Sequence, residues 1–386
     1  MNALSLKRLP LPSVDTTLVA AGLMLLTWGL VMVASSSVAS AEKLIDAPLY
    51  YFFRQLAFAG IGLSATMIAL CVPMRAWENS GFMLVAFSLF LLVLVLLPGV
   101  GVEVNNARRW IDLGVFRLQA SEPARLGLML YLAGYVVRRQ LELQYTFIGL
   151  FKALIPICVA SALLMLEPDF GATVMLLAVS FVVLFVGGAR LIWLLALALT
   201  AVGGLALLAT SAAYRVKRLL SYQNPWADSN DGGYQLTQSL IAVGRGEWTG
   251  VGLGNSVQKL LYLPEQHTDF IFAILAEEFG LVGVVALVAL FCVIVARGFS
   301  IGRSAEKMDA RFRAYVAYGL SAWIGGQVLV NLSVNMGLLP TKGLTLPLIS
   351  YGGSSLITVC VMLGLLLRIE HENRRELAGR PSGVPA

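Results

Sequence analysis

Apolar runs long enough to cross a lipid bilayer constrain this chain more than any other feature. A transmembrane helix needs about 20 predominantly apolar residues, and such runs recur from one end of the sequence to the other. Hydrophobic residues make up 58% of the 386 residues and charged residues only 13%, whereas a soluble domain carries about 25% charged residues. The sequence therefore predicts an all-α polytopic membrane protein, with residues 1–386 forming a single transmembrane domain.

About ten transmembrane helices fit the pattern, with one large loop between the seventh and the eighth. The predicted spans are 17–36, 54–73, 82–100, 122–137, 148–166, 171–188, 191–210, 270–297, 312–336 and 344–367. The first has too long an apolar core for a cleaved signal peptide, and many spans follow it, so we expect an anchor that is retained.

The distribution of lysine and arginine predicts the orientation. Arg138, Arg139 and the cations of 297–313 all fall on one side if the chain starts in the cytoplasm, and short cytoplasmic loops are enriched in these residues. We therefore expect residues 1–16 and 368–386 in the cytoplasm. The large loop, 211–269, is then extracytoplasmic, which is the periplasmic side of an inner membrane.

Several other classes of function find little support in the sequence. The four cysteines lie in apolar runs without the spacing of metal ligands, which indicates small buried hydrophobes. The glycines of 250–254 lack the strand–helix context of a dinucleotide site, so no nucleotide cofactor is expected. No basic run is long enough to indicate binding to nucleic acid.

Two groups of charged residues lie at or near the predicted outer face in the first half of the chain. Arg109 and Trp110 fit either an interfacial anchor or a site that binds a phosphate and stacks on a sugar. Glu122 and Arg125 share one side of the fourth span, because residues three apart are neighbours on a helix. A charge pair inside a membrane is a candidate functional site, and a structural salt bridge is the alternative.

Further polar residues follow on the same predicted side. Gln235 and Ser239 share one face of a predicted interfacial helix, and Lys259 follows in the same loop. This loop fits either the binding of an anionic lipid-linked substrate or contact with anionic lipid. Lys342 and Ser354, two further candidates for substrate binding, flank a segment rich in proline, glycine and serine that interrupts the last apolar run. A broken helix at membrane depth is tolerated where it is buried in protein or lines a cavity, so this segment favours a cavity. Close helix–helix packing at its glycines is the alternative.

Asp269 stands at the first residue of the eighth span, at the end of the large loop. Burial at the edge of a low-dielectric region raises the pKa of a carboxyl group and brings it towards the working range of a general base. Mg²⁺ needs only one or two carboxylates besides phosphate oxygens, so Asp269 is also the side chain most suited to hold a divalent cation. The sequence leaves both roles open.

These polar residues occur in motifs that resemble the SEDS family (shape, elongation, division and sporulation proteins). The similar stretches are LYLPEQHTDFIFAILAEEFG at 261–280, NNARRWIDLG at 105–114, SEPARL at 121–126, EPDFGA at 167–172 and PLISYGGSS at 347–355. They cover nearly the whole chain. Within the family, QKLLYLPE and NMGLLPTKGLTL resemble the division member more than the elongation member.

The resemblance implies a peptidoglycan glycosyltransferase that polymerises lipid II, the undecaprenyl-linked disaccharide-pentapeptide, at the outer face of the membrane. It places the essential loop aspartate at Asp269, the loop tryptophan at Trp110, and the intramembrane acid and base at Glu122 and Arg125. It also implies a partner, the division-type class B penicillin-binding protein, together with other division proteins at the septum.

A single candidate base predicts an inverting single displacement, with cations holding the pyrophosphate that leaves. Two other classes of function remain open. Charged residues within spans also suit a flippase for the same lipid, and a non-catalytic division scaffold would not need Asp269. The sequence does not assign roles to Glu277 and Glu278, which lie within the eighth span.

Overall fold

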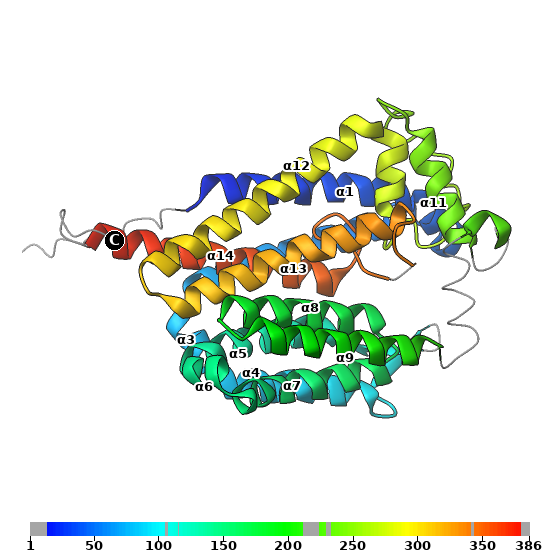
Figure 1. The fold of residues 1–386 in the computed structure, drawn as a ribbon. Helices are drawn as coiled ribbons and strands as arrows, with labels where there is room; N and C mark the ends of the chain where they lie inside the picture. Colours follow the sequence, from blue (N-terminus) through cyan, green and yellow to red (C-terminus); the bar gives the residue numbers. More distant parts are fainter. Residues whose placement is uncertain are drawn as a thin grey trace, which may run out of the picture.

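The computed structural model describes residues 14–104, 107–114, 116–210, 224–228, 233–340 and 343–379, most of which are helical. The bundle is built from long helices that run side by side (Figure 1). Within the described residues these are α1 (Thr16–Ile45), α2 (Tyr50–Cys71), α4 (Gly81–Leu96), α5 (Ser121–Arg138), α7 (Phe147–Leu166), α8 (Phe170–Val186), α9 (Leu191–Thr210), α12 (Ile271–Lys307), α13 (Arg311–Asn335) and α14 (Gly353–Gly379). Shorter helical pieces are α3 (Met74–Asn79), α6 (Gln140–Tyr145), α11 (Tyr234–Arg245) and the 3-10 turn η1 (Pro225–Asp228).

Each long helix corresponds to one predicted span, which confirms the helical membrane architecture. Five of them, namely α1, α2, α7, α12 and α14, are individually long and apolar enough to cross a membrane. Three others are shorter apolar helices, and α5 and α13 carry more polar residues. Some boundaries differ from the prediction, since α1 and α12 run further and the last helix begins only at Gly353.

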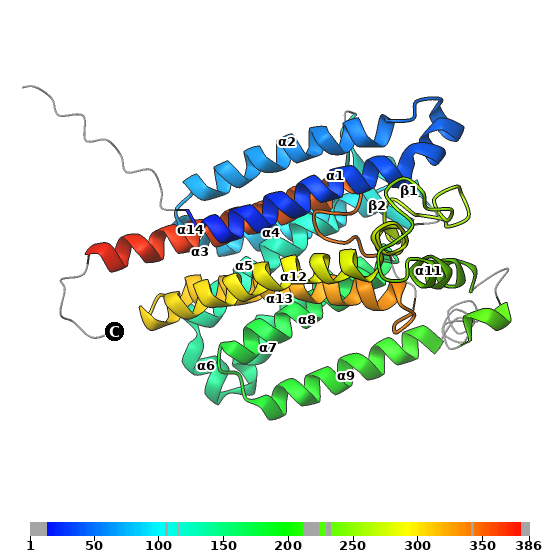
Figure 2. The same cartoon turned by 90° about the horizontal axis from the view of Figure 1, so that it is seen from above.

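The two ends of the described chain lie at the same end of the bundle, as an even number of spans requires (Figure 1). The opposite end carries α11 and the loops before α12; we call it the loop end. Helix α14 lies in the middle and packs on α2, while α12 packs on α13 and α1. Helix α9 lies at the margin beside α8 (Figure 2). The buried apolar side chains form one large cluster that reaches through the bundle.

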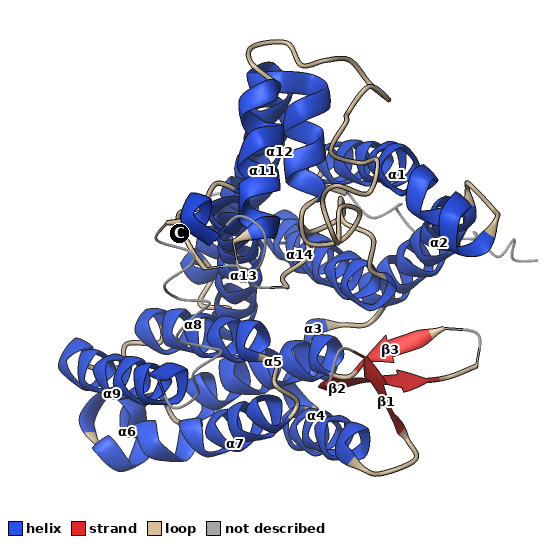
Figure 3. Cartoon of the chain, turned by 90° about the vertical axis from the view of Figure 1, so that its right-hand side faces the viewer, coloured by secondary structure: helices blue, strands red, loops and turns tan. Residues whose placement is uncertain are grey.

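A small antiparallel sheet at the loop end is an addition to the predicted all-helical fold. Its strands, β1 (Gly101–Val104), β2 (Ala107–Asp112) and β3 (Arg117–Gln119), are paired in sequence order. Trp110 pairs with Val102 on one side and Gln119 on the other. The sheet stands beside the end of α4, and its last strand contacts α14 (Figure 3).

Helix α12 is broken near its start. Gly280 has φ 62° and ψ −162°, so Ile271–Phe279 and Leu281–Lys307 are two helical pieces. The backbone groups freed by the break are satisfied by the segment 247–252. Val251 and Gly252 donate to the carbonyls of Glu277 and Glu278, at 3.0 and 3.1 Å. In return, Leu281 and Val282 donate to the carbonyls of residues 247 and 248 at 2.9 and 3.1 Å. A break at this depth is tolerated because protein groups replace the missing helical bonds.

Candidate functional site

Asp269 lies in the turn before α12, and its backbone is fixed by the amides of α13. The Nδ2 groups of Asn331 and Asn335 donate to the Asp269 carbonyl at 3.0 and 3.1 Å. Both asparagines are buried and stand one helical turn apart. These two buried amides of α13, which we call the amide stripe, therefore hold the backbone of Asp269 and leave its carboxylate free for chemistry.

The segment 343–352, which returns into the bundle before α14, closes the other side of this turn. Asn331 also donates to the carbonyl of Leu344 at 2.6 Å, and Ser350 Oγ donates to the carbonyl of Thr268 at 2.6 Å. The Tyr351 amide donates to the His267 carbonyl at 2.8 Å. A Cβ atom at Gly343 would lie 2.9 Å from Asp269 Oδ2, so this glycine leaves the space beside the carboxylate open.

The surroundings of Asp269 suit a proton acceptor. Burial raises the pKa of its carboxyl group to about 7, and the nearby Glu265 and Asp169 carboxylates act in the same direction. The Arg109 guanidinium opposes this shift. The side chain is only half-buried, so it reaches solvent at the loop end. A carboxyl group with a pKa near 7 is well matched to general base catalysis at neutral pH.

Arg109 links the small sheet to the turn between α7 and α8. Its Nε donates to the carbonyl of Glu167 at 3.1 Å, and its Nη2 donates to the carbonyl of Pro168. Glu167 is fully buried, and within the described residues neither of its carboxylate oxygens has a hydrogen-bond partner. Burial raises the pKa of Glu167 to about 8. Asp169 caps α8 by accepting from the Ala172 amide at 3.1 Å.

Glu122 and Arg125 form the ion pair that their spacing predicts. Arg125 Nη2 donates to Glu122 Oε1, and Arg125 Nε donates to the Ser121 carbonyl at 3.2 Å. The guanidinium also lies 5.0 Å from the centre of the Trp323 ring, a cation–π geometry. Both charged side chains are buried, and the contact between Arg125 and Trp323 joins α5 to α13 inside the bundle.

The other predicted site residues fall into distinct settings. Trp110 is half-buried in β2, and Ser354 Oγ accepts from the Gln119 amide at 2.8 Å, which fixes β3 to α14. Ser239 Oγ donates to the Asn335 carbonyl at 2.8 Å and so joins α11 to the amide stripe, while Gln235 is half-buried nearby on α11. Lys342 lies outside the described residues.

An apolar groove at the loop end contains an arginine that the sequence analysis did not select. The groove has a volume of about 760 Å³ and is lined by 47–50, by α2 and by Phe116, which lies directly before β3. Arg54 is its only charged lining residue, and its guanidinium donates to the Tyr50 hydroxyl at 2.9 Å. Within the described part of the chain no carboxylate pairs with Arg54. Arg54 lies at the start of a predicted span, where a cation commonly marks the membrane boundary. The sequence alone therefore did not indicate a functional role for it.

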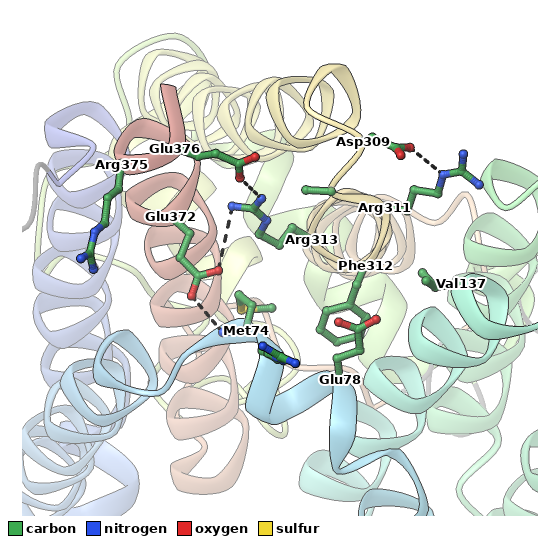
Figure 4. A pocket seen from close by; sticks show the side chains of 12 residues that line it. Met74, Glu78, Val137, Asp309, Arg311, Phe312, Arg313, Glu372, Arg375 and Glu376 are labelled. Carbon is green, nitrogen blue, oxygen red and sulfur yellow. Dashed lines mark hydrogen bonds and ion pairs between the residues drawn. The ribbon is translucent and has the colours of Figure 1, made fainter. Parts of the chain in front are cut away.

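A second hollow, of about 840 Å³, lies at the other end of the bundle (Figure 4). It is lined by α3, by the ends of α5, α13 and α14, and by residues 309 and 310 between α12 and α13. Its charges are largely compensated, since Arg313 pairs with Glu376 and lies 4.0 Å from Glu372, and Arg311 pairs with Asp309 at 2.8 Å. Paired charges far from Asp269 make this hollow a poor candidate for the catalytic site.

The described residues contain no cluster of three or more side chains suited to hold a metal ion. Asp269 has the carboxylates of Glu265 and Asp169 close enough to influence its pKa. This arrangement fits an ion shared with a phosphorylated substrate, because Mg²⁺ commonly uses one or two carboxylates together with phosphate oxygens. It does not fit an ion held by protein side chains alone.

The fold and the site define a polytopic membrane protein with a half-buried carboxylate, Asp269, and an apolar groove at its loop end. Residues 16–375 match the family model of the FtsW/RodA/SpoVE cell cycle proteins. The chain therefore belongs to this family, which agrees with the resemblance found in the sequence motifs.

Curated relatives cover nearly the whole chain. A protein of Thioalkalivibrio sulfidiphilus is 50% identical over 359 residues, which are 93% of this chain and 90% of the relative. A protein of Pseudomonas fluorescens is 49% identical over 364 residues, 94% of this chain and 89% of its own. Both are named probable peptidoglycan glycosyltransferase FtsW.

Two solved structures share the fold. One belongs to a study of how a peptidoglycan synthase complex coordinates polymerization and crosslinking, and it superposes with a TM-score of 0.77 at 31% identity. The other is the rod shape determining protein RodA of Thermus thermophilus, with a TM-score of 0.69 at 31% identity. Each comparison covers 94% of this chain and 98% of the other.

Proposed function

We propose that this protein is a peptidoglycan glycosyltransferase that polymerises lipid II at the outer face of the cytoplasmic membrane. The observation that carries the proposal is the half-buried Asp269 side chain at the loop end, whose backbone carbonyl accepts from two buried amides and whose carboxyl group has a pKa raised to about 7. Family membership and the names of the relatives support the same activity.

The groove lined by α2 suits the lipid part of the substrate. Its walls are almost entirely apolar and its one cation, Arg54, lies without a carboxylate partner in the described chain. Prenyl chains require an apolar surface, and a guanidinium binds phosphate oxygens through paired hydrogen bonds. The donor would place its prenyl tail along α2, with its pyrophosphate near Arg54 and its sugar towards Asp269.

In the reaction, the 4-hydroxyl of the acceptor sugar attacks C1 of the donor sugar. Asp269 accepts the proton of that hydroxyl as the new C–O bond forms, and the bond from C1 to the pyrophosphate oxygen breaks. The pyrophosphate keeps the electron pair, so nearby cations stabilise the developing charge. We assign this role to Arg109, whose charge lowers the pKa of Asp269, and to Arg54 in the groove. One displacement inverts the configuration at C1.

We propose that Asp269 can also bind a divalent cation. Such an ion, when bound, supplies positive charge for the pyrophosphate. Asp269 would be its protein ligand, and the substrate phosphates would supply most of the others.

We propose further that the chain works at the division septum with a class B penicillin-binding protein and other division proteins. Its orientation would place both termini in the cytoplasm. The support is the naming of the relatives and the solved peptidoglycan synthase complex that shares the fold.

The test is polymerisation of lipid II by the purified full-length protein, alone and with its transpeptidase partner, with and without a chelator. We expect Asp269→Ala to lower the rate of chain formation by about 100-fold or more, since loss of a general base costs about 10² to 10⁴. Asp309→Ala, at the other end of the bundle, is the control. Normal chains from Asp269→Ala would reject the assignment. Transport of lipid II into liposomes without polymerisation would instead favour a flippase.

A further inference from the structure

Two adjacent carboxylates, Glu277 and Glu278, are buried at the end of the first helical piece of α12. This placement is unfavourable on its own. A buried charge loses its hydration, and a carboxylate near the C-terminal end of a helix meets the negative end of the helix dipole. Both side chains are instead stabilised by partners from α1, from α11 and from the loop 256–269, which carries Asp269.

Glu277 holds the first part of that loop. Its Oε1 accepts from Arg245 Nη1 of α11 and from the Val257 amide, both at 3.1 Å. Its Oε2 accepts from Ser256 Oγ and, at 3.3 Å, from the Gln258 amide. One carboxylate therefore ties α11 and three consecutive loop residues to α12.

Glu278 holds the next residue, Lys259, against α1. Its Oε1 lies 2.9 Å from Lys259 Nζ, and Ser35 Oγ donates to the same carboxylate at 2.7 Å. Lys259 Nζ is also 3.0 Å from Ser35 Oγ. The Lys259 side chain is only 11% exposed and the Glu278 side chain is fully buried. The ammonium group is thus already neutralised inside the protein.

Gln266 connects Lys259 to the part of the loop that contains Asp269. Gln266 Nε2 donates to the Lys259 carbonyl at 2.8 Å and to Ser40 Oγ of α1 at 2.9 Å. Gln266 lies three residues before Asp269 and is itself buried. The loop 256–269 is consequently fixed at both ends, by the carboxylates of α12 and by the amides that bind the Asp269 carbonyl.

We infer that Glu278 and Lys259 are positioning residues, which set the place of Asp269 through the loop without touching the substrate. The inference rests on the proposed function. It differs from the sequence-based prediction that Lys259 binds the substrate. A misplacement of about 1 Å at a reacting group lowers the rate about 100-fold, so loss of this ion pair is expected to act on kcat.

The two roles of Lys259 give opposite results in one experiment. Purified Glu278→Gln, Lys259→Met and the double variant are compared with the unmodified protein in lipid II polymerisation. If the pair positions Asp269, each single variant lowers kcat about tenfold or more and changes KM less than about twofold. The double variant then has a kcat no lower than that of the less active single variant. If Lys259 binds the substrate, Glu278→Gln frees the ammonium and keeps its activity, while Lys259→Met raises KM.

Controls separate positioning from unfolding. Asp15→Asn breaks a comparable ion pair, Asp15–Arg297, at the other end of the bundle, and should change the unfolding temperature without changing kcat. Should the single variants fail to fold, Ser35→Ala removes only one partner of Glu278 and should still lower kcat about threefold or more. Unchanged kcat in Ser35→Ala or Glu278→Gln overturns the inference. An unmodified protein that makes no glycan overturns the proposed function instead.

Discussion

At the scale of single residues, the site separates a fixed backbone from a titratable side chain. The Asp269 carbonyl accepts from two buried amides, whereas its carboxylate faces the open space beside Gly343. The backbone of Asp269 is therefore held from α13 by neutral hydrogen bonds, whose donors do not ionise. The carboxylate itself has a pKa near neutrality, so its charge changes with pH.

The raised pKa of Asp269 predicts a dependence of stability on pH. Between the ordinary pKa near 3.8 and the folded value of about 7, the folded protein keeps a proton that the unfolded chain has lost. Stability therefore falls as pH rises through this window. Asp269→Asn, which cannot ionise, should be more stable than the unmodified protein at pH 8 by about 1 to 2 kcal/mol, after allowance for the partial exposure of the side chain.

The measurement is thermal unfolding in detergent at pH 4 and at pH 8, with Asp309→Asn as an exposed control. The gain should appear at pH 8 and vanish at pH 4. A gain of equal size at both pH values would contradict the raised pKa. The same variant should be inactive in polymerisation, because an amide cannot accept the proton. Asp269 would then lower the stability of the folded protein at pH 8 while being required for activity.

Some residues of the candidate site could be predicted from the sequence, and others could not. Asp269, Glu122 and Arg125 could be singled out because a charge in an apolar run is rare. Arg54 could not, because a cation at the edge of a span is ordinary and only the folded groove shows its missing partner. Glu167 lies between two predicted spans, where a carboxylate is ordinary, and its full burial is visible only in the folded protein.

At the scale of elements, the broken start of α12 depends on one glycine. The φ of 62° and ψ of −162° at Gly280 belong to a region that essentially only glycine occupies. A Cβ there would lie 2.4 Å from the Gly250 nitrogen and 2.7 Å from the Gly246 carbonyl oxygen. Neither backbone atom can move without disturbing the bonds that cap the break.

Gly280→Ala should therefore destabilise the protein by about 3 kcal/mol or more, from backbone strain and overpacking together. Gly326→Ala, in the regular helix α13, is the matched control, because its added methyl group meets only the Met175 Cε at 3.4 Å. It should be neutral or stabilising by up to about 1 kcal/mol. Equal unfolding temperatures for the two variants would show that the break carries no strain.

Periodicity and length located the helices but not the small sheet or the ordered loop. The sequence predicts residues 101–121 only as a connection between two spans, because strands of 3 to 6 residues are too short to give a periodic signal. The loop before α12 owes its order to contacts with α1 and α13, which lie far away in the sequence. Such contacts are not visible in a local pattern.

At the scale of the whole molecule, the structure places the chain ends opposite the loops but does not assign either end to a compartment. The proposed orientation can be tested with single cysteines in a background where the four native cysteines are alanine. Trp248→Cys and Leu141→Cys are suited to this, because they lie at opposite ends of the bundle and are 72% and 73% exposed in the native chain.

A membrane-impermeant maleimide added to intact spheroplasts should label Trp248→Cys and leave Leu141→Cys unmodified. Permeabilised membranes should give labelling of both, which shows that the second thiol is reactive. The reverse pattern in spheroplasts would invert the orientation and move Asp269 to the cytoplasmic side.

The capped break in α12 has a consequence for the order in which the protein is built. Residues 247–252, which supply its hydrogen bonds, are synthesised before α12, so they are already available when that helix forms. The amides of α13 and the segment 343–352 arrive afterwards. A nascent chain that stops before residue 331 can cap the break but cannot hold Asp269 in place. Catalytic competence is therefore acquired last during biogenesis, after nearly the whole chain has entered the bilayer.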